Sequence, residues 1–301
     1  MTHSFLSRFA QERSVGIART PLALTLLALL LAGCESSPMN RSQIVLYSES
    51  DMAAQGTEAY AQMRREIPIS QDASATSYVN CVAERVVEAL PLEQQTRYVW
   101  EVTLFADSQV NAFALPGGKI GVYEGLLDVA INQHQLAAVM AHEVGHVLAS
   151  HSNERASQAT LRNVGFGVAQ LLGVSDSTLQ AWDLGTQLGL FLPFNRSQES
   201  EADVIGLTLM ARGGFEPEES ITLWENMAAS AGARSPELLS THPSPNTRIS
   251  DPNLLYFSLH CILSRRNSYA LPWYVDRPPD ERPGIPWYGF FGWGKCLSRQ
   301  S

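Results

Sequence analysis

The spacing of apolar residues along the chain predicts a mainly helical body that includes a small sheet. Residues 73–90 carry apolar positions at a helical period, and we expect further helices over residues 134–151 and 196–211. Residues 98–105 alternate in polarity and are rich in β-branched and aromatic types, which predicts a strand. Two shorter β runs are expected within residues 110–123, on either side of a Pro-Gly-Gly turn signal. The pattern therefore favours an α+β fold with a small antiparallel sheet.

The remaining segments have less regular patterns. Residues 35–72 are polar, and we expect a tether followed by a helix. A short helix is expected over residues 124–131, and another is expected to begin at Pro217. Residues 165–194 are Gly-rich, apolar and almost uncharged; we interpret them as a buried pair of core helices, with a flap over a groove as the alternative. Residues 262–301 are rich in proline and aromatic residues and show no clear period.

The N-terminal segment has the pattern of an export signal. Three arginines precede an apolar run from Pro21 to Leu31, and the sequence Leu-Ala-Gly-Cys then ends at Cys34. This ending resembles a bacterial lipobox, which implies removal of residues 1–33 and a diacylglycerol thioether on Cys34 that anchors the protein in a membrane. Because Glu35 follows, the resemblance implies the outer membrane. A retained transmembrane anchor is the alternative, but about 11 apolar residues are too few to span a bilayer comfortably.

Composition limits the class of protein. The hydrophobic content of 45% and the charged content of 17% are typical of a globular chain. A net charge of −9 argues against sequence-independent nucleic-acid binding, which needs a basic face, so we expect no nucleic-acid partner. We divide the chain into a signal peptide (1–33), a lipidated N-terminus with tether and first helix (34–72), a main domain (73–260) and a C-terminal extension (261–301).

Cysteine usage is consistent with export. An oxidising compartment favours one disulfide among Cys81, Cys261 and Cys296. Three cysteines allow three pairings, and the sequence does not choose among them. None of the three has the spacing of metal ligands.

A candidate metal-binding motif lies in the helix expected over residues 134–151. His142 and His146 are about 40° apart around the helix axis and roughly 6 Å apart along it. Both imidazoles can therefore reach one zinc ion about 2 Å from each ring nitrogen. Glu143 projects beside them, where its carboxylate can act as general base on a metal-bound water without ligating the metal. Apolar residues surround these polar groups, which indicates that their presence serves a function.

A catalytic zinc ion needs a third protein ligand and an open fourth position for water. The best candidates lie in the helix expected over residues 196–211, where Glu199 and Asp203 share one face. Glu199 would complete the metal site, and Asp203 would accept the free N–H of a ligating histidine. Glu201 points about 200° away from Glu199 and is the alternative ligand.

At these motifs the chain resembles a known family of zinc peptidases. It is similar to the gluzincin metallopeptidases related to the CAAX prenyl proteases and the HtpX-type membrane proteases, and within them to exported lipoproteins of the LoiP and BepA type. The resemblance spans about Tyr78 to Ile249. It rests on four segments in the family's order, which are Asn111 to Gly118, His142 to His146, Ser197 to Asp203, and Thr241 to Pro243 with Arg248.

The resemblance implies roles for particular positions in a zincin-like fold with one zinc ion per chain. It implies that Glu199 is the third zinc ligand. Asn111 and Ala112 would belong to an edge strand that lines the active-site cleft and pairs with the backbone of a peptide substrate. His242 or Arg248 would stabilise the oxyanion of the tetrahedral intermediate. An alternative role for His242 is to occupy the open zinc position in a latent state.

We therefore expect a zinc-dependent endopeptidase that is lipid-anchored in the bacterial outer membrane and faces the periplasm. Its expected substrates are unfolded or misassembled envelope proteins, which it would remove as part of quality control. The sequence shows neither the run of transmembrane helices nor the helical repeats found in some members of the family. Two alternatives stay open: a zinc-containing periplasmic chaperone or assembly factor with little or latent proteolytic activity, and a zinc hydrolase of a non-peptide substrate.

Overall fold

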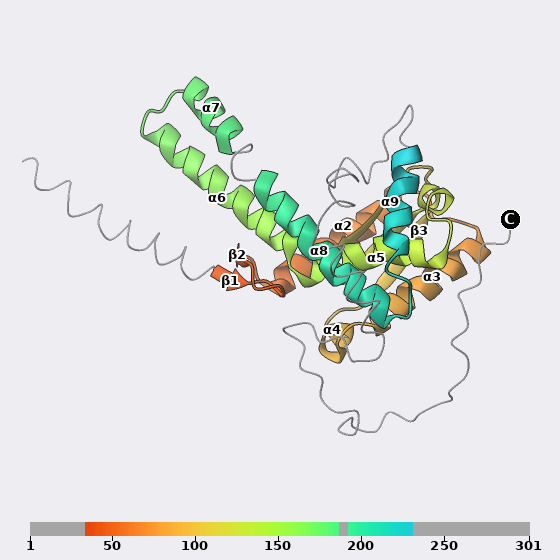
Figure 1. Cartoon of the computed structure of the whole chain (residues 1–301). Coiled ribbons are helices and arrows are strands. Elements are labelled where there is room, and N and C mark those ends of the chain that lie inside the picture. Colours follow the sequence, from red (N-terminus) through yellow and green to blue (C-terminus); the bar gives the residue numbers. More distant parts are fainter. Residues whose placement is uncertain (1–33, 187–191, 231–301) are drawn as a thin grey trace, which may run out of the picture.

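The computed structural model describes residues 34–186 and 192–230 (Figure 1). Several expectations concern positions outside these ranges, namely the export signal in residues 1–33, the side chains of His242 and Arg248, and the extension from residue 261 onward. Within the described ranges, no helix is both long enough and apolar enough to cross a membrane.

Helix α5 (Gln133–Leu148) is the centre of the fold. It begins where the Asn132 side chain accepts hydrogen bonds from two backbone N–H groups of the first turn. Nearly all of its residues are buried, as in other helices that are apolar on every side. The elements that pack against it include α3 (Ala73–Glu88), β4 (Ala112–Leu115), α8 (Leu192–Arg212) and α9 (Glu219–Ser230). Helices α3, α5, α8 and α9 confirm the four helices predicted from the sequence in these regions.

A three-stranded sheet packs beside α5. Strands β3 (Glu101–Phe105), β5 (Lys119–Tyr123) and β4 are hydrogen-bonded in the order β3-β5-β4, so β4 is an edge strand. The predicted β runs are confirmed, but the expectation of an antiparallel sheet is wrong for one pair. Strand β3 runs parallel to β5, and only β4 is antiparallel to it. The tight turn after β4, with Gly117 and Gly118 at positive φ, returns the chain between β3 and β4.

The N-terminal segment folds onto the body, which corrects the expected tether. Strands β1 (Cys34–Ser36) and β2 (Ser42–Ile44) form an antiparallel hairpin, and α2 (Glu49–Glu66) is the expected helix. The Tyr60 hydroxyl of α2 donates a hydrogen bond to Thr103 Oγ1 of β3 at 2.6 Å. Most side chains of α2 are exposed, which accounts for the polar composition of the segment, and its buried residues are Met52, Gly56 and Tyr60.

Two short elements and a disulfide complete the described body. Helix α4 (Leu92–Arg97) follows α3, and η1 (Glu124–Asp128) is a short 3-10 helix where the sequence predicted a longer α-helix. Short runs of this kind are common connectors between longer elements. Cys81 of α3 is disulfide-bonded, whereas Cys261 and Cys296 lie outside the described residues.

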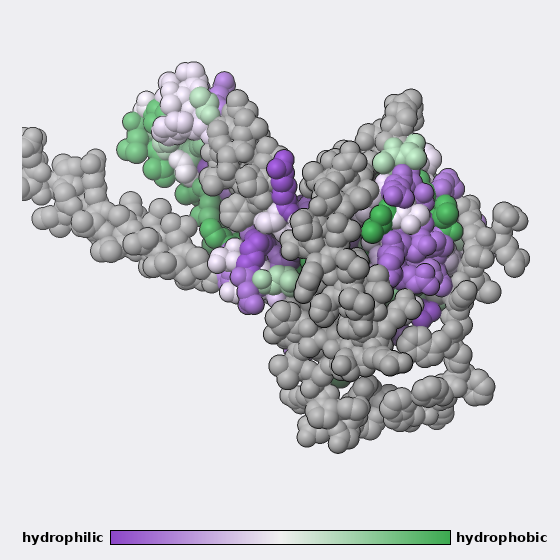
Figure 2. Space-filling view, in the orientation of Figure 1, coloured by the Kyte–Doolittle hydropathy of each residue, from purple (hydrophilic) through white to green (hydrophobic). Residues whose placement is uncertain are grey.

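Helices α6 (His151–Leu171) and α7 (Asp176–Thr186) form an arm that extends away from the body (Figure 1). The interpretation of this apolar stretch as core helices is wrong wherever the structure describes it. Buried residues of α6 lie only in its first two turns, and apolar side chains gather on the surface of the arm (Figure 2). The large apolar residues exposed there are Val164, Val168, Leu171, Leu172 and Trp182. The helices themselves are as expected, but an apolar composition does not determine whether another element covers a helix.

Helices α5 and α8 approach each other so closely that their backbones are almost in contact. A Cβ atom on Gly145 of α5 would lie 2.9 Å from the backbone oxygen of Ala202 in α8. A Cβ atom on Gly206 of α8 would lie 3.0 Å from the backbone nitrogen of His142 in α5. Each helix therefore has a glycine where the backbone of the other helix passes, and side chains on the facing turns are brought together.

We expect Gly145→Ala to destabilise the protein, because the new methyl group would meet backbone atoms that cannot rotate away. Overpacking of this kind costs about 1–3 kcal/mol, which exceeds the roughly 0.5–1 kcal/mol that alanine gains over glycine in a helix. Gly165→Ala in α6 is the matched control, since nothing lies within 4 Å of its Cβ position. It should leave the free energy of unfolding unchanged or raise it. Urea unfolding measures both, and equal stability of the two variants would contradict the close packing.

Candidate metal centre

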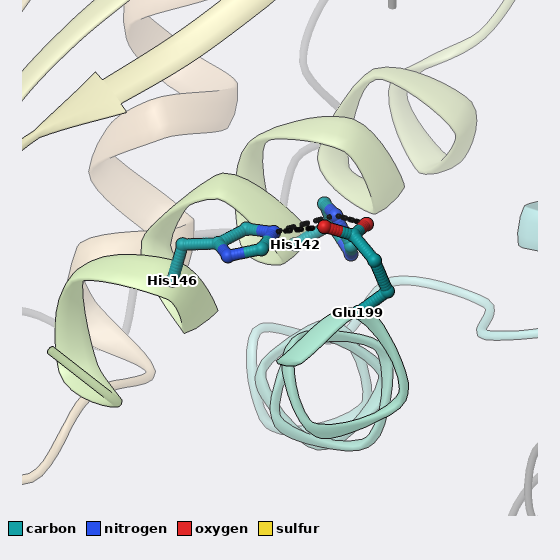
Figure 3. Close-up of side chains that lie close together, drawn as sticks. All are labelled: His142, His146 and Glu199. Carbon is teal, nitrogen blue, oxygen red and sulfur yellow. Dashed lines mark hydrogen bonds and ion pairs between the residues drawn. The ribbon is translucent and has the colours of Figure 1, made fainter. Parts of the chain in front are cut away.

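Three side chains from α5 and α8 converge on one point (Figure 3). His142 and His146 extend from successive turns of α5, and Glu199 faces them from α8. The two Nε2 atoms are 3.1 Å apart. Oxygens of Glu199 lie 3.3 Å from Nε2 of His142 and 3.4 Å from Nε2 of His146. Among the described residues, these are the His, Cys, Asp or Glu side chains whose ligand atoms lie close enough to share a metal ion.

The distances fit a tetrahedral zinc site. With bonds of about 2.0–2.2 Å to nitrogen and oxygen, neighbouring ligands of a tetrahedral zinc ion are about 3.3 Å apart. All three side chains are buried. Burial lowers the pKa of His146 to about 3, so its imidazole is neutral at neutral pH and keeps a lone pair for a metal. Two histidines and a carboxylate leave one tetrahedral position open, as a catalytic zinc site requires.

Asp203 holds His142 in the orientation that a metal ligand needs. Its Oδ1 lies 2.9 Å from Nδ1 of His142. Because a carboxylate only accepts hydrogen bonds, Nδ1 carries the proton and Nε2 presents its lone pair toward His146 and Glu199. The structure therefore places Asp203 where the sequence analysis expects it, one turn after Glu199 on α8.

Glu143 follows His142 on α5 and is buried, with 5% of its surface exposed. Its negative charge acts on His146, where it favours the protonated form of the ring. The carboxylate does not belong to the cluster of atoms that can share a metal ion. Glu143 therefore lies near His146 and outside the cluster of three possible ligands, a placement that would suit a general base.

Glu201 faces away from this cluster, as its angular position on the helix predicts. Its Oε2 lies 3.2 Å from Nε2 of His151 and 2.9 Å from Nε of Arg41. Burial raises the pKa of Glu201, but hydrogen bonds from His151, Ser37 and Arg41 outweigh this effect and lower the pKa to about 2. The carboxylate is therefore ionised and bonded elsewhere, and Glu199 is the acidic residue that faces the two histidines.

The sequence analysis missed His151, the first residue of α6. Helix α5 ends at Leu148, and Ser150, with a left-handed φ of 55°, turns the chain. The turn places Nδ1 of His151 2.8 Å from Nδ1 of His146, on the side of that ring opposite the metal position. The only signal in the sequence is a third histidine nine positions after His142. The metal-binding motif ends at His146 and assigns no role to it.

The expected substrate-binding positions lie at the start of edge strand β4. Ala112 is the first residue of β4, and the carbonyl of Asn111 accepts a hydrogen bond from a backbone N–H of β5 at 3.1 Å. No described strand pairs with the outer edge of β4. A cavity of about 560 Å³ opens next to His146, between the N-terminal hairpin, the β4–β5 turn and the end of α5. His242 and Arg248 lie outside the described residues, so their roles stay predictions.

Comparison with known proteins identifies the family. Residues 73–252 match the model of peptidase family M48. The chain therefore belongs to this family. The matched range contains the metal cluster and also the positions of His242 and Arg248. The resemblance inferred from the motifs is confirmed at the level of the family.

Curated relatives include mitochondrial and bacterial proteins. The mitochondrial metalloendopeptidase OMA1 of Schizosaccharomyces pombe is 40% identical over 176 residues, which are 58% of this chain and 51% of the relative. The mitochondrial metalloendopeptidase OMA1 of Saccharomyces cerevisiae is 36% identical over 162 residues, which cover 50% of this chain and 45% of that protein. The β-barrel assembly-enhancing protease of Escherichia coli K12 is 31% identical over 201 residues, which cover 63% and 40% of the two chains. The matches span about half or less of these relatives.

We expect Asp203→Ala to weaken zinc binding by about 10–100-fold, because His142 loses the partner that keeps its proton on Nδ1. Asp203→Asn is the matched control. Its amide oxygen can still accept a hydrogen bond from Nδ1, so its zinc affinity should fall less. Competition with a chromophoric chelator gives the zinc dissociation constant of each variant. Wild-type affinity in Asp203→Ala would show that the orientation of His142 does not depend on Asp203.

Proposed function

We propose that this protein is a zinc-dependent endopeptidase. The observation that carries the proposal is the convergence of His142, His146 and Glu199 at distances of 3.1–3.4 Å, which suit a tetrahedral zinc ion. These residues lie in the range that matches peptidase family M48. The names of the relatives describe metalloendopeptidases and a protease, which supports the same activity here.

The proposed mechanism assigns one task to each group. His142, His146 and Glu199 would hold the zinc ion, which would supply an activated water molecule and a polarised scissile carbonyl. Glu143 removes a proton from the attacking water and later returns it to the leaving amine. Asp203 keeps the proton of His142 on Nδ1, away from the metal position. His242 or Arg248 stabilises the oxyanion of the tetrahedral intermediate, as the family resemblance implies.

We propose unfolded polypeptide segments as the substrate class. Strand β4 is an edge strand, and an extended peptide can add to such an edge through backbone hydrogen bonds that do not depend on its sequence. Asn111 and Ala112, at the start of this strand, are the proposed contact positions. A folded protein offers few free extended segments, so the site favours misfolded or misassembled chains.

We also propose that the protein is lipid-anchored at Cys34 in the bacterial outer membrane and removes misassembled envelope proteins in the periplasm. Two observations support this. The N-terminal sequence has the pattern of a lipoprotein signal that ends at Cys34. One relative, from Escherichia coli, is named a β-barrel assembly-enhancing protease. Strand β1 begins at Cys34, so an anchor there would hold the body next to the membrane surface.

Glu143→Gln tests the mechanism. The variant keeps the shape of the side chain but cannot take a proton, so cleavage of casein should fall by about 10²–10⁴-fold while one zinc ion per chain is retained. Glu84→Gln makes the same chemical change on an exposed surface of α3 and should cleave like the wild type. The assay measures casein cleavage and zinc content side by side. Full activity in Glu143→Gln would contradict its role as general base.

His242→Ala in the same assay separates the proposal from its main alternative. Cleavage by His242→Ala alone would indicate a latent enzyme in which this histidine blocks the site. If the wild type and His242→Ala both bind zinc but neither cleaves casein or other unfolded proteins, the endopeptidase proposal is wrong, and the assembly factor and the hydrolase of a non-peptide substrate are the readings left.

A further inference from the structure

The two histidines of the metal centre are held in different ways. Nδ1 of His142 lies 2.9 Å from a carboxylate oxygen of Asp203. Nδ1 of His146 lies instead 2.8 Å from Nδ1 of His151, and Nε2 of His151 lies 3.2 Å from a carboxylate oxygen of Glu201. His146 therefore reaches its carboxylate through a second imidazole, which is completely buried.

The positions of the protons in this series of hydrogen bonds follow from the groups at its two ends, which are His146 and Glu201. If His146 is to ligate a metal through Nε2, its neutral ring carries the proton on Nδ1, which then donates to Nδ1 of His151. His151 consequently carries its own proton on Nε2 and donates it to Glu201, which only accepts. Every hydrogen bond in this chain then has one donor and one acceptor, and the lone pair of His146 points toward Glu199.

Arg41, which lies in the N-terminal hairpin, extends this series of hydrogen bonds beyond Glu201. Its Nε donates to Glu201 at 2.9 Å, and its two terminal nitrogens donate to the two oxygens of Glu154, each at 2.7 Å. The side chains of Glu201 and Glu154 are only 3% and 1% exposed. Two buried carboxylates in one place repel each other unless a cation lies between them. Without Arg41, Glu201 would lose the partner that holds its carboxylate in place beside His151.

We propose that Arg41, Glu201 and His151 are positioning residues that orient His146 as a metal ligand. The inference rests on the proposed function, because it assumes that the cluster of His142, His146 and Glu199 holds zinc. It makes the N-terminal hairpin part of the metal centre. The hairpin that begins at Cys34, the expected site of the membrane anchor, thus also supports the ligand geometry through Arg41.

Arg155, a described neighbour of His146, cannot replace the hydrogen bond to His151. Nη2 of Arg155 lies 3.5 Å from Nδ1 of His146, but a guanidinium only donates and cannot accept the proton that a ligating His146 carries there. His151 is not itself part of the metal cluster, because it lies on the opposite side of the His146 ring. His151 is therefore the residue placed to accept from His146.

The test measures the zinc affinity of the full-length protein and of variants at the residues of this hydrogen-bond series. His151→Leu removes both hydrogen bonds, and Arg41→Gln removes the cation between the two carboxylates. His151→Gln is the conservative variant, because its amide can still accept and donate. Arg64→Gln is the matched control for Arg41→Gln, since Arg64 also pairs with a glutamate, Glu101, but both side chains are about 40% exposed. Arg41→Lys keeps the charge and carries the test if Arg41→Gln does not fold.

Competition with a chelator gives the zinc dissociation constant of each folded variant, and the visible absorption of the cobalt-substituted proteins reports the geometry of the ligands. We expect His151→Leu and Arg41→Gln to bind zinc about 10–100-fold more weakly than the wild type, with altered cobalt spectra. His151→Gln and Arg41→Lys should recover part of the affinity, and Arg64→Gln should stay within about twofold of the wild type. Unfolding of the metal-free proteins identifies variants whose fold is lost.

Two outcomes would overturn the inference, and they are distinguishable. Suppose that the wild type binds zinc and that the folded variants have zinc dissociation constants within about twofold of the wild type, with unchanged cobalt spectra. The proposal that these residues position His146 is then wrong, and the endopeptidase proposal stands. If the wild type binds no zinc, the proposed function fails and the inference fails with it.

Discussion

The candidate site depends on the close approach of α5 and α8. Gly145 and Gly206 bring the two helix backbones almost into contact, so that side chains on the facing turns reach one another. The result is a set of ligand atoms 3.1–3.4 Å apart, which bonds of about 2 Å to a central ion can span. A larger helix separation would lengthen the distances from Glu199 and Asp203 to the two histidines.

The close packing of α5 and α8 also places polar groups inside an apolar core, where each of them needs a partner. An uncompensated buried charge typically costs about 3–5 kcal/mol, so carboxylates are retained there only with donors around them. Carboxylates on two sides of helix α8 have such partners. Asp203 bonds to His142 on the metal side, and Glu201 bonds to His151 and Arg41 on the other. Folding of the N-terminal hairpin and formation of the metal centre are therefore linked in one network.

The sequence predicts the parts of the site that lie on regular helices. The i, i+4 spacing of His142 and His146 and the angular offset between Glu199 and Glu201 determine which side chains face the same point, and the structure agrees. Strand direction was not predictable, because successive side chains point to opposite faces in parallel and antiparallel strands alike. Exposure of the α6–α7 arm was not predictable either, since composition does not tell which apolar helix is covered. Arg41 gives no local signal, as it meets Glu201 across 160 positions of the chain.

The most direct test of this account is the position of zinc in crystals of the metal-loaded protein, located from anomalous scattering at the zinc absorption edge. We predict a single peak per chain, about 2 Å from Nε2 of His142, Nε2 of His146 and a carboxylate oxygen of Glu199. Nδ1 of His146 should still face His151. A peak bound by Glu201 or His151 in place of Glu199, or no peak at the α5–α8 contact, would contradict the account.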